Sequence, residues 1–360
     1  MRFGMLHLFE NPADKTEGQI VSEQMQLMRA AEDLGFDSVW PAEHHFTEYG
    51  YCSSPALSLA AIASETKHIR LGTGVVVLPL NHPLRVAEDY AFLDHLSGGR
   101  VDLGIGRGYQ PLEFERYGVE QTSTREQFKE GLEVIRQAWT DGRVDFEGRH
   151  YQFRDVPIRP RPVQTPHPPI WMACLSPESF ELAGRYGCNL LSGSVFGLTP
   201  DVAEARRTDY YRGLAAGGHS AQGRQSGCLM FVYVADTVEQ ARSEFRDAVV
   251  WYFHTIGKYV APEKGKAPIK SYELYTQFRD GIEAITWDQL VEGDAVICGD
   301  PDLVVEKLHK YQQIYGFTEV LCWTRLGGLD HRKVLRSMEL MQSKVIPHLR
   351  DSQPPPPPAV

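Results

Sequence analysis

Short apolar segments alternate with amphipathic segments along almost the whole chain. Eight of the apolar segments have the length and residue content of buried strands. They are Arg2–Phe9, Asp37–Trp40, Ile69–Leu78, Val101–Ile105, Pro169–Ala173, Cys188–Leu191, Cys228–Val234 and Glu319–Trp323.

The segments between these runs place apolar residues at helical spacing and begin with helix-starting residues. Proline opens several of them, at the position where its missing N–H costs nothing. The predicted helices are Gln19–Leu34, Pro55–Glu65, Pro83–Leu96, Thr124–Thr140, Pro177–Tyr186, Pro200–Ala216, Val238–His254, Asp302–Tyr315 and His331–Val345.

Alternating strands and helices imply a parallel sheet, and eight such units match a closed (β/α)8 TIM barrel. We therefore expect an α/β protein with one barrel domain over residues 1–350, interrupted by inserted loops. The rival interpretation is a doubly wound open sheet with an appended domain. Its dinucleotide fingerprint is weak here, because the nearest string, residues 104–108 (GIGRG), has the wrong spacing.

Two long segments interrupt the alternation, and a proline-rich segment ends the chain. Residues 142–165 are expected to form a hairpin and an irregular connection. Residues 254–299 form either a lid over a binding site or a surface insertion, and both interpretations stay open. Residues 351–360, with prolines at 354–358, are expected to be a flexible, solvated tail.

The 360 residues carry a net charge of −10, which argues against a partner that is nucleic acid or an anionic membrane surface. No signal peptide and no stretch long enough to span a bilayer is present, so a cytoplasmic protein is expected. The six cysteines form no C-x-x-C pair. They predict buried, reduced thiols and give no support to a metal site.

Functional residues of a (β/α)8 barrel follow the carboxyl ends of its strands. His44 and His45 follow the second predicted strand, and only one of them can face the barrel mouth. An imidazole there suits proton transfer, and a structural pair is the alternative. Gly72 and Gly74, at the third strand, allow a flat ligand to approach the backbone, and His82 follows them.

Four polar residues after the next strands can meet one oxyanion. Arg107 stands between two glycines, and Arg125 lies in a first helical turn, where a cation is unfavourable unless an anion is near. Ser176 and Ser179 fall at a helix N-terminus, which is a natural phosphate site. Ordinary capping and a surface salt bridge explain the same residues. Motifs of serine or zinc hydrolases are absent.

Several strings at these strand ends carry a family resemblance. They are residues 36–50 (FDSVWPAEHHFTEYG), 71–79 (LGTGVVVLP), 97–100 (SGGR), 104–114 (GIGRGYQPLEF) and 327–329 (GGL). Together they resemble the bacterial luciferase-like flavin-dependent monooxygenases, including the luciferase α subunit (alkanal monooxygenase), over about residues 1–350.

The resemblance implies a protein that binds reduced FMN, supplied by a separate NAD(P)H:flavin reductase, with O2 as co-substrate. Oxygen adds at the flavin C4a in that family, and the peroxyflavin oxidises a small organic substrate. The resemblance also implies a homodimer or heterodimer, with Pro55–Glu65 and Pro83–Leu96 at the subunit contact. Residues 254–299 correspond to the family's mobile lid.

Carried over by position, His44 matches the family's catalytic base. Gly74 and Val75 match a cis peptide bond beside the isoalloxazine, and Gly106 replaces the reactive cysteine of luciferase, which argues against light emission. The residues that match the cofactor site are Gly74, Val75, Gly106, Arg107, Arg125, Leu175, Ser176 and Ser179. Leu175 replaces a glutamate whose backbone touches the flavin, and Ser179 replaces a threonine.

The substrate pocket is expected to include His45, His82, Tyr109 and Trp323, with Phe46, Phe196 and Trp251 as further aromatic candidates. The substrate itself is not predicted. One alternative function is an F420-dependent oxidoreductase on the same barrel, which transfers hydride. Another is a flavin-binding protein without catalysis. The adjacent histidines and paired arginines favour FMN, and the eight strands with His44 argue for an enzyme.

Overall fold

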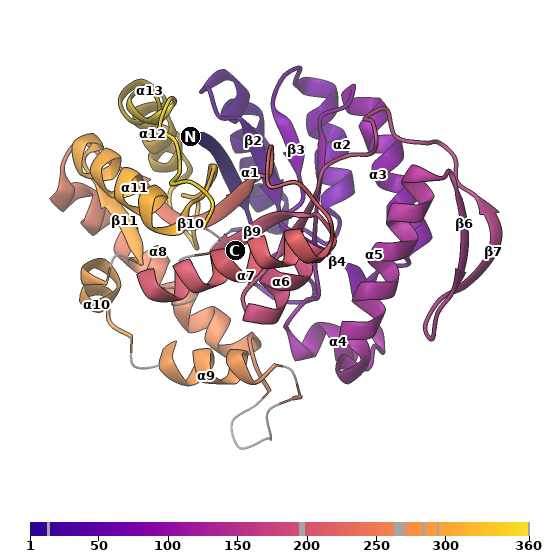
Figure 1. The fold of residues 1–360 in the computed structure, drawn as a ribbon. Helices are drawn as coiled ribbons and strands as arrows, with labels where there is room; N and C mark the ends of the chain where they lie inside the picture. Colours follow the sequence, from indigo (N-terminus) through magenta and orange to yellow (C-terminus); the bar gives the residue numbers. More distant parts are fainter. Residues whose placement is uncertain are drawn as a thin grey trace.

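The computed structural model describes residues 1–12, 15–193, 199–262, 269–270, 272–282, 285–293 and 295–358. Within these residues, parallel strands form a closed barrel that is surrounded by helices (Figure 1). Pairing of the last barrel strand with the first, which places Leu321 opposite Gly4, closes the barrel. The predicted (β/α)8 TIM barrel is confirmed. The barrel strands are, in order, β1 (Arg2–His7), β2 (Ser38–Pro41), β3 (Arg70–Gly72), β5 (Val101–Gly106), β8 (Ile170–Ala173), β9 (Asn189–Gly193), β10 (Ser226–Val234) and β12 (Glu319–Trp323).

Large side chains fill the barrel interior where small residues leave room for them. The rings of Trp40 and Trp171 meet edge to face, with centroids 5.2 Å apart. A Cβ atom on Gly72 would lie 2.3 Å from the Trp40 ring, so only glycine fits there. Ser38 accepts a hydrogen bond from Trp40 Nε1 and donates one to Glu319. Ser38 therefore links the Trp40 indole to one oxygen of the Glu319 carboxylate within the core.

The helices follow the predicted pattern and pack outside the barrel. Three have the predicted bounds: α2 (Pro55–Glu65), α5 (Thr124–Thr140) and α7 (Pro200–Ala216). The others, whose ends differ by a few residues, are α1 (Glu17–Asp33), α3 (Pro83–Ser97), α6 (Pro177–Arg185), α8 (Val238–Tyr259), α11 (Pro301–Tyr315) and α12 (His331–Leu340). A π-helical turn (Met341–Val345) and α13 (Ile346–Leu349) extend the last of them.

The predicted strand Ile69–Leu78 is interrupted. It consists of β3, β4 (Val76–Val77) and a 3-10 turn (Leu78–Leu80), and the Gly74–Val75 peptide bond is cis. The Thr73 hydroxyl donates to the Gly104 carbonyl at 2.7 Å and accepts from the Gly104 N–H at 2.8 Å. Hydrogen bonds of the Thr73 side chain therefore replace backbone–backbone bonds between the strands at this point. A pattern of apolar residues cannot indicate this replacement.

The inserted segments contain more regular structure than the sequence predicts. The hairpin is present as β6 (Arg143–Glu147) and β7 (Gln152–Pro157). The region expected to be a lid or an insertion begins inside α8 and contains α9 (Glu273–Ile282), α10 (Trp287–Glu292) and β11 (Val296–Gly299). β11 pairs in parallel with the end of β10, and α4 (Pro111–Tyr117) follows β5. Both elements are short, which explains why the sequence pattern missed them.

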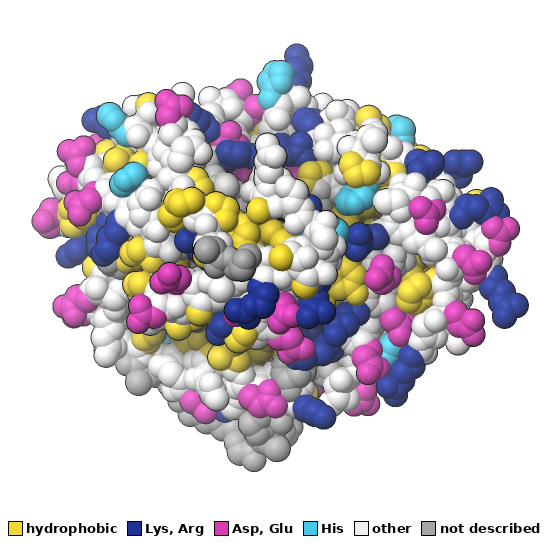
Figure 2. Space-filling model, in the orientation of Figure 1, with side chains coloured by type: hydrophobic (Ala, Val, Ile, Leu, Met, Phe, Trp, Pro, Cys, Tyr) yellow, Lys and Arg dark blue, Asp and Glu magenta, His cyan; other side chains and the backbone are white. Residues whose placement is uncertain are grey.

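The tail expected to be solvated lies against the barrel helices. It crosses α7 in Figure 1, and hydrophobic side chains gather at the same place in Figure 2. Arg207 donates to the carbonyls of Pro355 and Pro356 at 3.2 and 2.8 Å. Gln313 donates to the carbonyl of Gln353 at 2.9 Å. The backbone carbonyls of the described tail residues form no hydrogen bonds within a strand or helix. The side chains of Arg207 and Gln313 donate to them instead.

Three further observations concern the described part of the chain. No helix in it is long and apolar enough to cross a membrane. Its His, Cys, Asp and Glu side chains form no group that could hold a metal ion. All six cysteines are buried and unpaired with one another, as expected for reduced thiols.

Candidate active site

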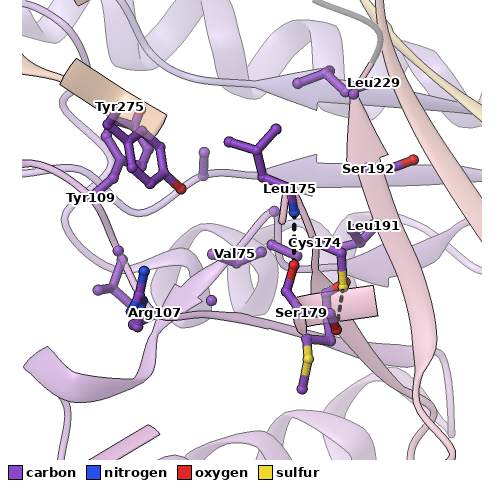
Figure 3. A pocket seen from close by; sticks show the side chains of 18 of the residues that line it. Val75, Arg107, Tyr109, Cys174, Leu175, Ser179, Leu191, Ser192, Leu229 and Tyr275 are labelled. Atoms are coloured by element: carbon purple, nitrogen blue, oxygen red, sulfur yellow. Dashed lines mark hydrogen bonds between the residues drawn. The ribbon is translucent and has the colours of Figure 1, made fainter. Parts of the chain in front are cut away.

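A cavity of about 400 Å³ lies at the carboxyl ends of the barrel strands (Figure 3). This volume lies within the range of small-molecule sites. Its wall is largely apolar and includes Leu6, Leu8, Val75, Met172, Leu191, Leu229 and Leu321. The catalytic candidate and all eight cofactor-site candidates line it: His44, Gly74, Val75, Gly106, Arg107, Arg125, Leu175, Ser176 and Ser179.

His44 is buried and is oriented by an acidic residue. Its Nδ1 lies 3.0 Å from Oε1 of Glu113, which also accepts the backbone N–H of His45 at 2.9 Å. Nδ1 also lies 3.2 Å from the side-chain amide nitrogen of Gln110, but the shorter contact is with a carboxylate, which only accepts hydrogen bonds and so favours the imidazole hydrogen on Nδ1. The neutral ring then presents Nε2 as a proton acceptor. Among the described residues, no hydrogen bond to Nε2 is present, and His44 lines the cavity.

His45 turns away from the cavity, although the sequence places it in the substrate pocket. Its Nε2 lies 3.1 Å from Oε1 of Glu43, and Nδ1 lies 3.1 Å from the Tyr117 hydroxyl. Glu43 also accepts from the Val77 N–H at 2.8 Å and from Asn81 at 2.9 Å. The second histidine is therefore part of a buried network that fixes the loop carrying the first.

His82 also lies outside the cavity. Its ring packs edge to face on Phe153 of the hairpin, with centroids 5.7 Å apart, and near Tyr151 at 6.2 Å. The hairpin packs beside this residue, which stays exposed, and the sequence did not predict that contact. Of the other aromatic candidates, Phe46 is 57% exposed, and Trp251 packs on Gly327. Phe196 lies outside the described residues.

The cationic end of the cavity combines two arginines with the start of α6. The Arg107 guanidinium lies 4.0 Å from the centre of the Tyr272 ring. Arg125 forms an ion pair with Glu178, in the first turn of α6. Arg125 lies in the first turn of a helix, where a cation is unfavourable unless an anion is near. The Glu178 carboxylate is that anion. The salt-bridge interpretation of Arg125 therefore holds in this structure, and Arg107 has a different partner.

Two serines close this end of the cavity. Ser176 caps α6 by accepting from the Ser179 N–H at 3.3 Å. The Ser179 hydroxyl accepts from the Leu175 N–H at 3.0 Å and donates to the Ser176 carbonyl at 2.6 Å (Figure 3). These bonds hold the turn in shape. Two hydroxyls and a helix N-terminus are a donor set suited to a phosphate.

Two glycines, Gly74 and Gly106, also line the cavity beside apolar side chains. A Cβ atom on Gly106 would lie 2.5 Å from Val75 Cγ2, and one on Gly74 would lie 2.9 Å from Leu6 Cδ1. Both positions therefore require glycine because neighbouring side chains already fill the space. The wall that results is narrow and apolar, and it suits a flat ring.

Aromatic residues form a further part of the cavity wall, and Tyr109 and Tyr275 lie on the same side as Arg107 (Figure 3). The hydroxyl of Tyr109 donates to that of Tyr49 at 3.0 Å, and the Tyr49 and Tyr252 hydroxyls are 3.2 Å apart. The Trp323 ring meets that of Tyr252 at 4.5 Å. The Tyr275 ring, from α9, stacks on Tyr109 with centroids 5.3 Å apart (Figure 3). Tyr109 and Trp323 thus lie in the cavity where the sequence placed them.

Sequence reasoning missed Glu113, Tyr49, Tyr252 and Tyr275. Glu113 and Tyr49 belong to strings that the family resemblance already marked, so a signal was present. Tyr252 and Tyr275 lie more than 200 residues from Tyr49 in the sequence. Their contribution depends on tertiary packing, and no local pattern indicates it.

The residues fit a ligand that combines an anionic group with a flat ring. FMN has this form: its phosphate matches the arginine and serine donors, and its isoalloxazine matches the narrow apolar wall. His44 lies beside Tyr49 and Tyr109 in the same cavity. The donor set therefore agrees with the cofactor that the sequence predicts.

Comparisons with known proteins agree with this geometry. The luciferase-like monooxygenase family model matches residues 1–317. The oxygenase component of a flavin-dependent trigonelline monooxygenase from Acinetobacter baylyi is 29% identical over 98% of this chain and 97% of its own. The structure of monooxygenase RslO1 from Streptomyces bottropensis is similar with a TM-score of 0.85 and 28% identity, covering 97% of this chain and 99% of its own. An F420-dependent secondary alcohol dehydrogenase shares the fold at 18% identity, with a TM-score of 0.76 and coverage of 97% and 99%. The chain belongs to the luciferase-like monooxygenase family.

Proposed function

We propose that this chain is the oxygenase component of a two-component, FMN-dependent monooxygenase. Reduced FMN, O2 and a small organic substrate would give oxidised FMN, the monooxygenated substrate and water, which balances atoms and electrons. The observation that carries the proposal is one cavity lined both by cationic and hydroxyl donors and by the His44–Glu113 pair. When bound, reduced FMN supplies the two electrons that activate O2.

Arg107, Ser176 and Ser179 are proposed to bind the FMN phosphate. Arg107 contributes charge, and the start of α6 contributes N–H groups and hydroxyls. Arg125 is shared with Glu178, so its contribution is smaller than that of Arg107. The apolar wall at Gly74, Val75 and Gly106 is proposed to face the isoalloxazine.

His44 is proposed to accept or return a proton at Nε2 during turnover. Its Nδ1–H is held by Glu113, which fixes the ring in one tautomer. Tyr275 and Tyr272 are proposed to cover the cavity and keep water out. Tyr275 stacks on Tyr109, and Tyr272 lies over Arg107.

The reduced flavin is proposed to come from a separate NAD(P)H:flavin reductase. The trigonelline monooxygenase relative is itself named as an oxygenase component, which supports this arrangement. A homodimer is proposed through α2 and α3, where Leu57, Phe92 and Leu96 are 74%, 56% and 51% exposed. Sedimentation of the wild type and of Phe92→Asp tests the dimer, which the substitution should dissociate.

Cofactor binding separates this function from the alternatives. Calorimetric titration with FMN, riboflavin and F420, in oxidised and photoreduced forms, measures which the protein selects. The proposal predicts that reduced FMN binds most tightly. Tighter binding of F420 would favour hydride transfer on the same barrel. His44→Ala should leave FMN affinity nearly unchanged while it slows turnover, whereas a non-catalytic flavin carrier would show no turnover to lose.

A further inference from the structure

A buried glutamine, Gln110, lies beside His44 and has no part in the proposed mechanism. It precedes α4, where its carbonyl accepts the Glu113 N–H at 3.2 Å. The residue is 0% exposed, and its Nε2 lies 3.2 Å from Nδ1 of His44. The same side chain is hydrogen-bonded to Tyr109, which lines the cavity. Gln110 therefore connects the proposed base to a residue of the cavity wall.

The contact between the two nitrogens brings two donors together. Nδ1 of His44 lies 3.0 Å from the Glu113 carboxylate, which only accepts hydrogen bonds and so favours the hydrogen on Nδ1. An amide NH2 group also only donates. The buried Oε1 of Gln110, meanwhile, has no hydrogen-bond partner among the described residues. A half turn of the amide exchanges its two ends, which have nearly the same shape, and removes both faults.

After this half turn, Gln110 Oε1 faces the Nδ1–H of His44, and the NH2 group is left for Tyr109. Burial raises the pKa of Tyr109, whereas its hydrogen bond with Gln110 acts in the opposite direction. An N–H that donates to a phenol oxygen has this effect, because it favours the ionised form. The Tyr109 hydroxyl keeps its own proton for Tyr49, to which it donates at 3.0 Å. Each proton in this series therefore has an acceptor.

We propose that Gln110 is a positioning residue for His44: its amide oxygen accepts from Nδ1–H, and its NH2 group donates to the Tyr109 hydroxyl. The inference rests on the proposed function and deepens it by adding a second group that holds the base. Glu113 and Gln110 share the Nδ1 hydrogen, and Nε2 is left as the proton acceptor. An acceptor at Nδ1 also stabilises the ring once it is protonated, because hydrogen bonds from a charged donor are stronger.

The other titratable groups that face the His44 ring agree with this role. Tyr49 and Tyr109 meet the ring edge to face, with centroids 4.7 and 5.8 Å away. Burial raises the pKa of both phenols, so both stay neutral at physiological pH. Glu43, the acid next to His44 in the sequence, is bonded to His45 instead. The carboxylate bonded to the ring is that of Glu113.

Neutron diffraction from deuterated crystals of the full chain tests the arrangement without turnover. Nitrogen and oxygen scatter neutrons differently and deuterium is visible, so the map identifies both ends of the Gln110 amide and the hydrogen of the His44 ring. We expect Oε1 toward Nδ1, deuterium on Nδ1, and the NH2 group toward Tyr109. An NH2 group toward Nδ1, or a neutral ring with its deuterium on Nε2, overturns the proposal.

Two variants test the effect on turnover through the pH profile of kcat/KM. Gln110→Met removes both hydrogen bonds. It should slow turnover at least about threefold and move the acidic limb to lower pH by about half a unit, because the protonated ring loses an acceptor. Tyr109→Phe keeps the ring and removes only the far partner of the amide, so the limb should move less. The double variant should match Gln110→Met, since both substitutions act through one amide.

Gln312→Met is the matched control. It removes a buried amide outside the cavity, which donates to the carbonyls of Phe317 and Ser352, and should lower stability without moving the limb. A limb that stays in place or moves to higher pH in Gln110→Met contradicts the inference, as do additive shifts in the double variant. FMN binding and turnover of the wild type, measured in parallel, show whether the flavin proposal fails separately.

Discussion

Nδ1 of His44 lies 3.0 Å from Oε1 of Glu113, so a carboxylate from α4 fixes the imidazole that lines the cavity. The same oxygen accepts the N–H of His45, which ties the loop after β2 to α4. One acidic residue thus sets both the tautomer of His44 and the position of its backbone.

Glu113→Gln should therefore slow turnover at least about tenfold and leave FMN affinity close to that of the wild type. The amide can hold the ring in place, but it no longer requires the hydrogen to sit on Nδ1. Steady-state kinetics separates kcat from KM, and calorimetry gives FMN affinity. Glu120→Gln, at an exposed position outside the cavity, serves as the control. An equal loss of FMN affinity in Glu113→Gln would make Glu113 a structural residue only.

Arg107→Ala should weaken FMN binding about 10- to 100-fold and leave riboflavin binding nearly unchanged. A charge-assisted bond to a phosphate contributes about 1.5–3 kcal/mol, and riboflavin has no phosphate. Arg185→Ala, on the outer face of α6 and paired with Glu181, is the matched control. The phosphate assignment is wrong if the Arg107 variant binds both flavins as the wild type does.

Tyr275→Ala should increase the fraction of O2 released as hydrogen peroxide several-fold. The ring of Tyr275 stacks on Tyr109 over the cavity, and its removal opens a path for water. Peroxide formed per FMN oxidised, measured with catalase-coupled oxygen uptake, reports this loss. Tyr275→Phe keeps the stacked ring and should behave as the wild type. Equal peroxide yields in both variants would show that the ring does not shield the site.

Protonation of His7 should lower the free energy of unfolding at acid pH. Burial lowers the pKa of His7 to about 4, from an ordinary value near 6.5, and its Nδ1 lies 2.8 Å from Gln24 Oε1. The unfolded chain therefore binds more protons between pH 4 and 6.5, and the stability from this group falls as the pH is lowered through that range.

His7→Asn keeps a donor near Gln24 and removes the titration. Between pH 7.5 and 5, the wild type should lose about 2 kcal/mol more unfolding free energy than the variant, as measured by urea denaturation. Burial raises the pKa of Glu10 to about 7, which acts with the opposite sign in the same range. Because Glu10 is present in both proteins, the difference isolates His7. Parallel pH profiles for the two proteins would contradict this prediction.

The sequence predicted the barrel because strands and helices recur along it with local periodicity, and α2, α5 and α7 have the predicted bounds. It could not predict where the strand after α2 breaks, since Thr73 bonds to Gly104, 31 residues away. The tail provides a similar example, because Arg207 and Gln313 supply its hydrogen bonds from α7 and α11.

The candidate site divides in the same way. His44 and Arg107 follow strand ends, so the barrel rule places them in the cavity without further information. His45 and His82 obey the same rule and still lie outside, because Glu43 and the hairpin residue Phe153 bind them elsewhere. Strand position therefore predicts which loops form the site, and tertiary partners decide which side chains enter it.

The reaction of enzyme-bound reduced FMN with O2 tests the central claim most directly. FMN is photoreduced without oxygen in the presence of the protein and mixed with oxygenated buffer, and flavin absorbance is followed by stopped flow. We expect reduced FMN to bind and its reoxidation to be delayed relative to free flavin, with His44→Ala retaining binding and altering the decay. Reoxidation at the rate of free FMN, with no binding of the reduced form, would contradict the assignment of this chain as an FMN-dependent monooxygenase.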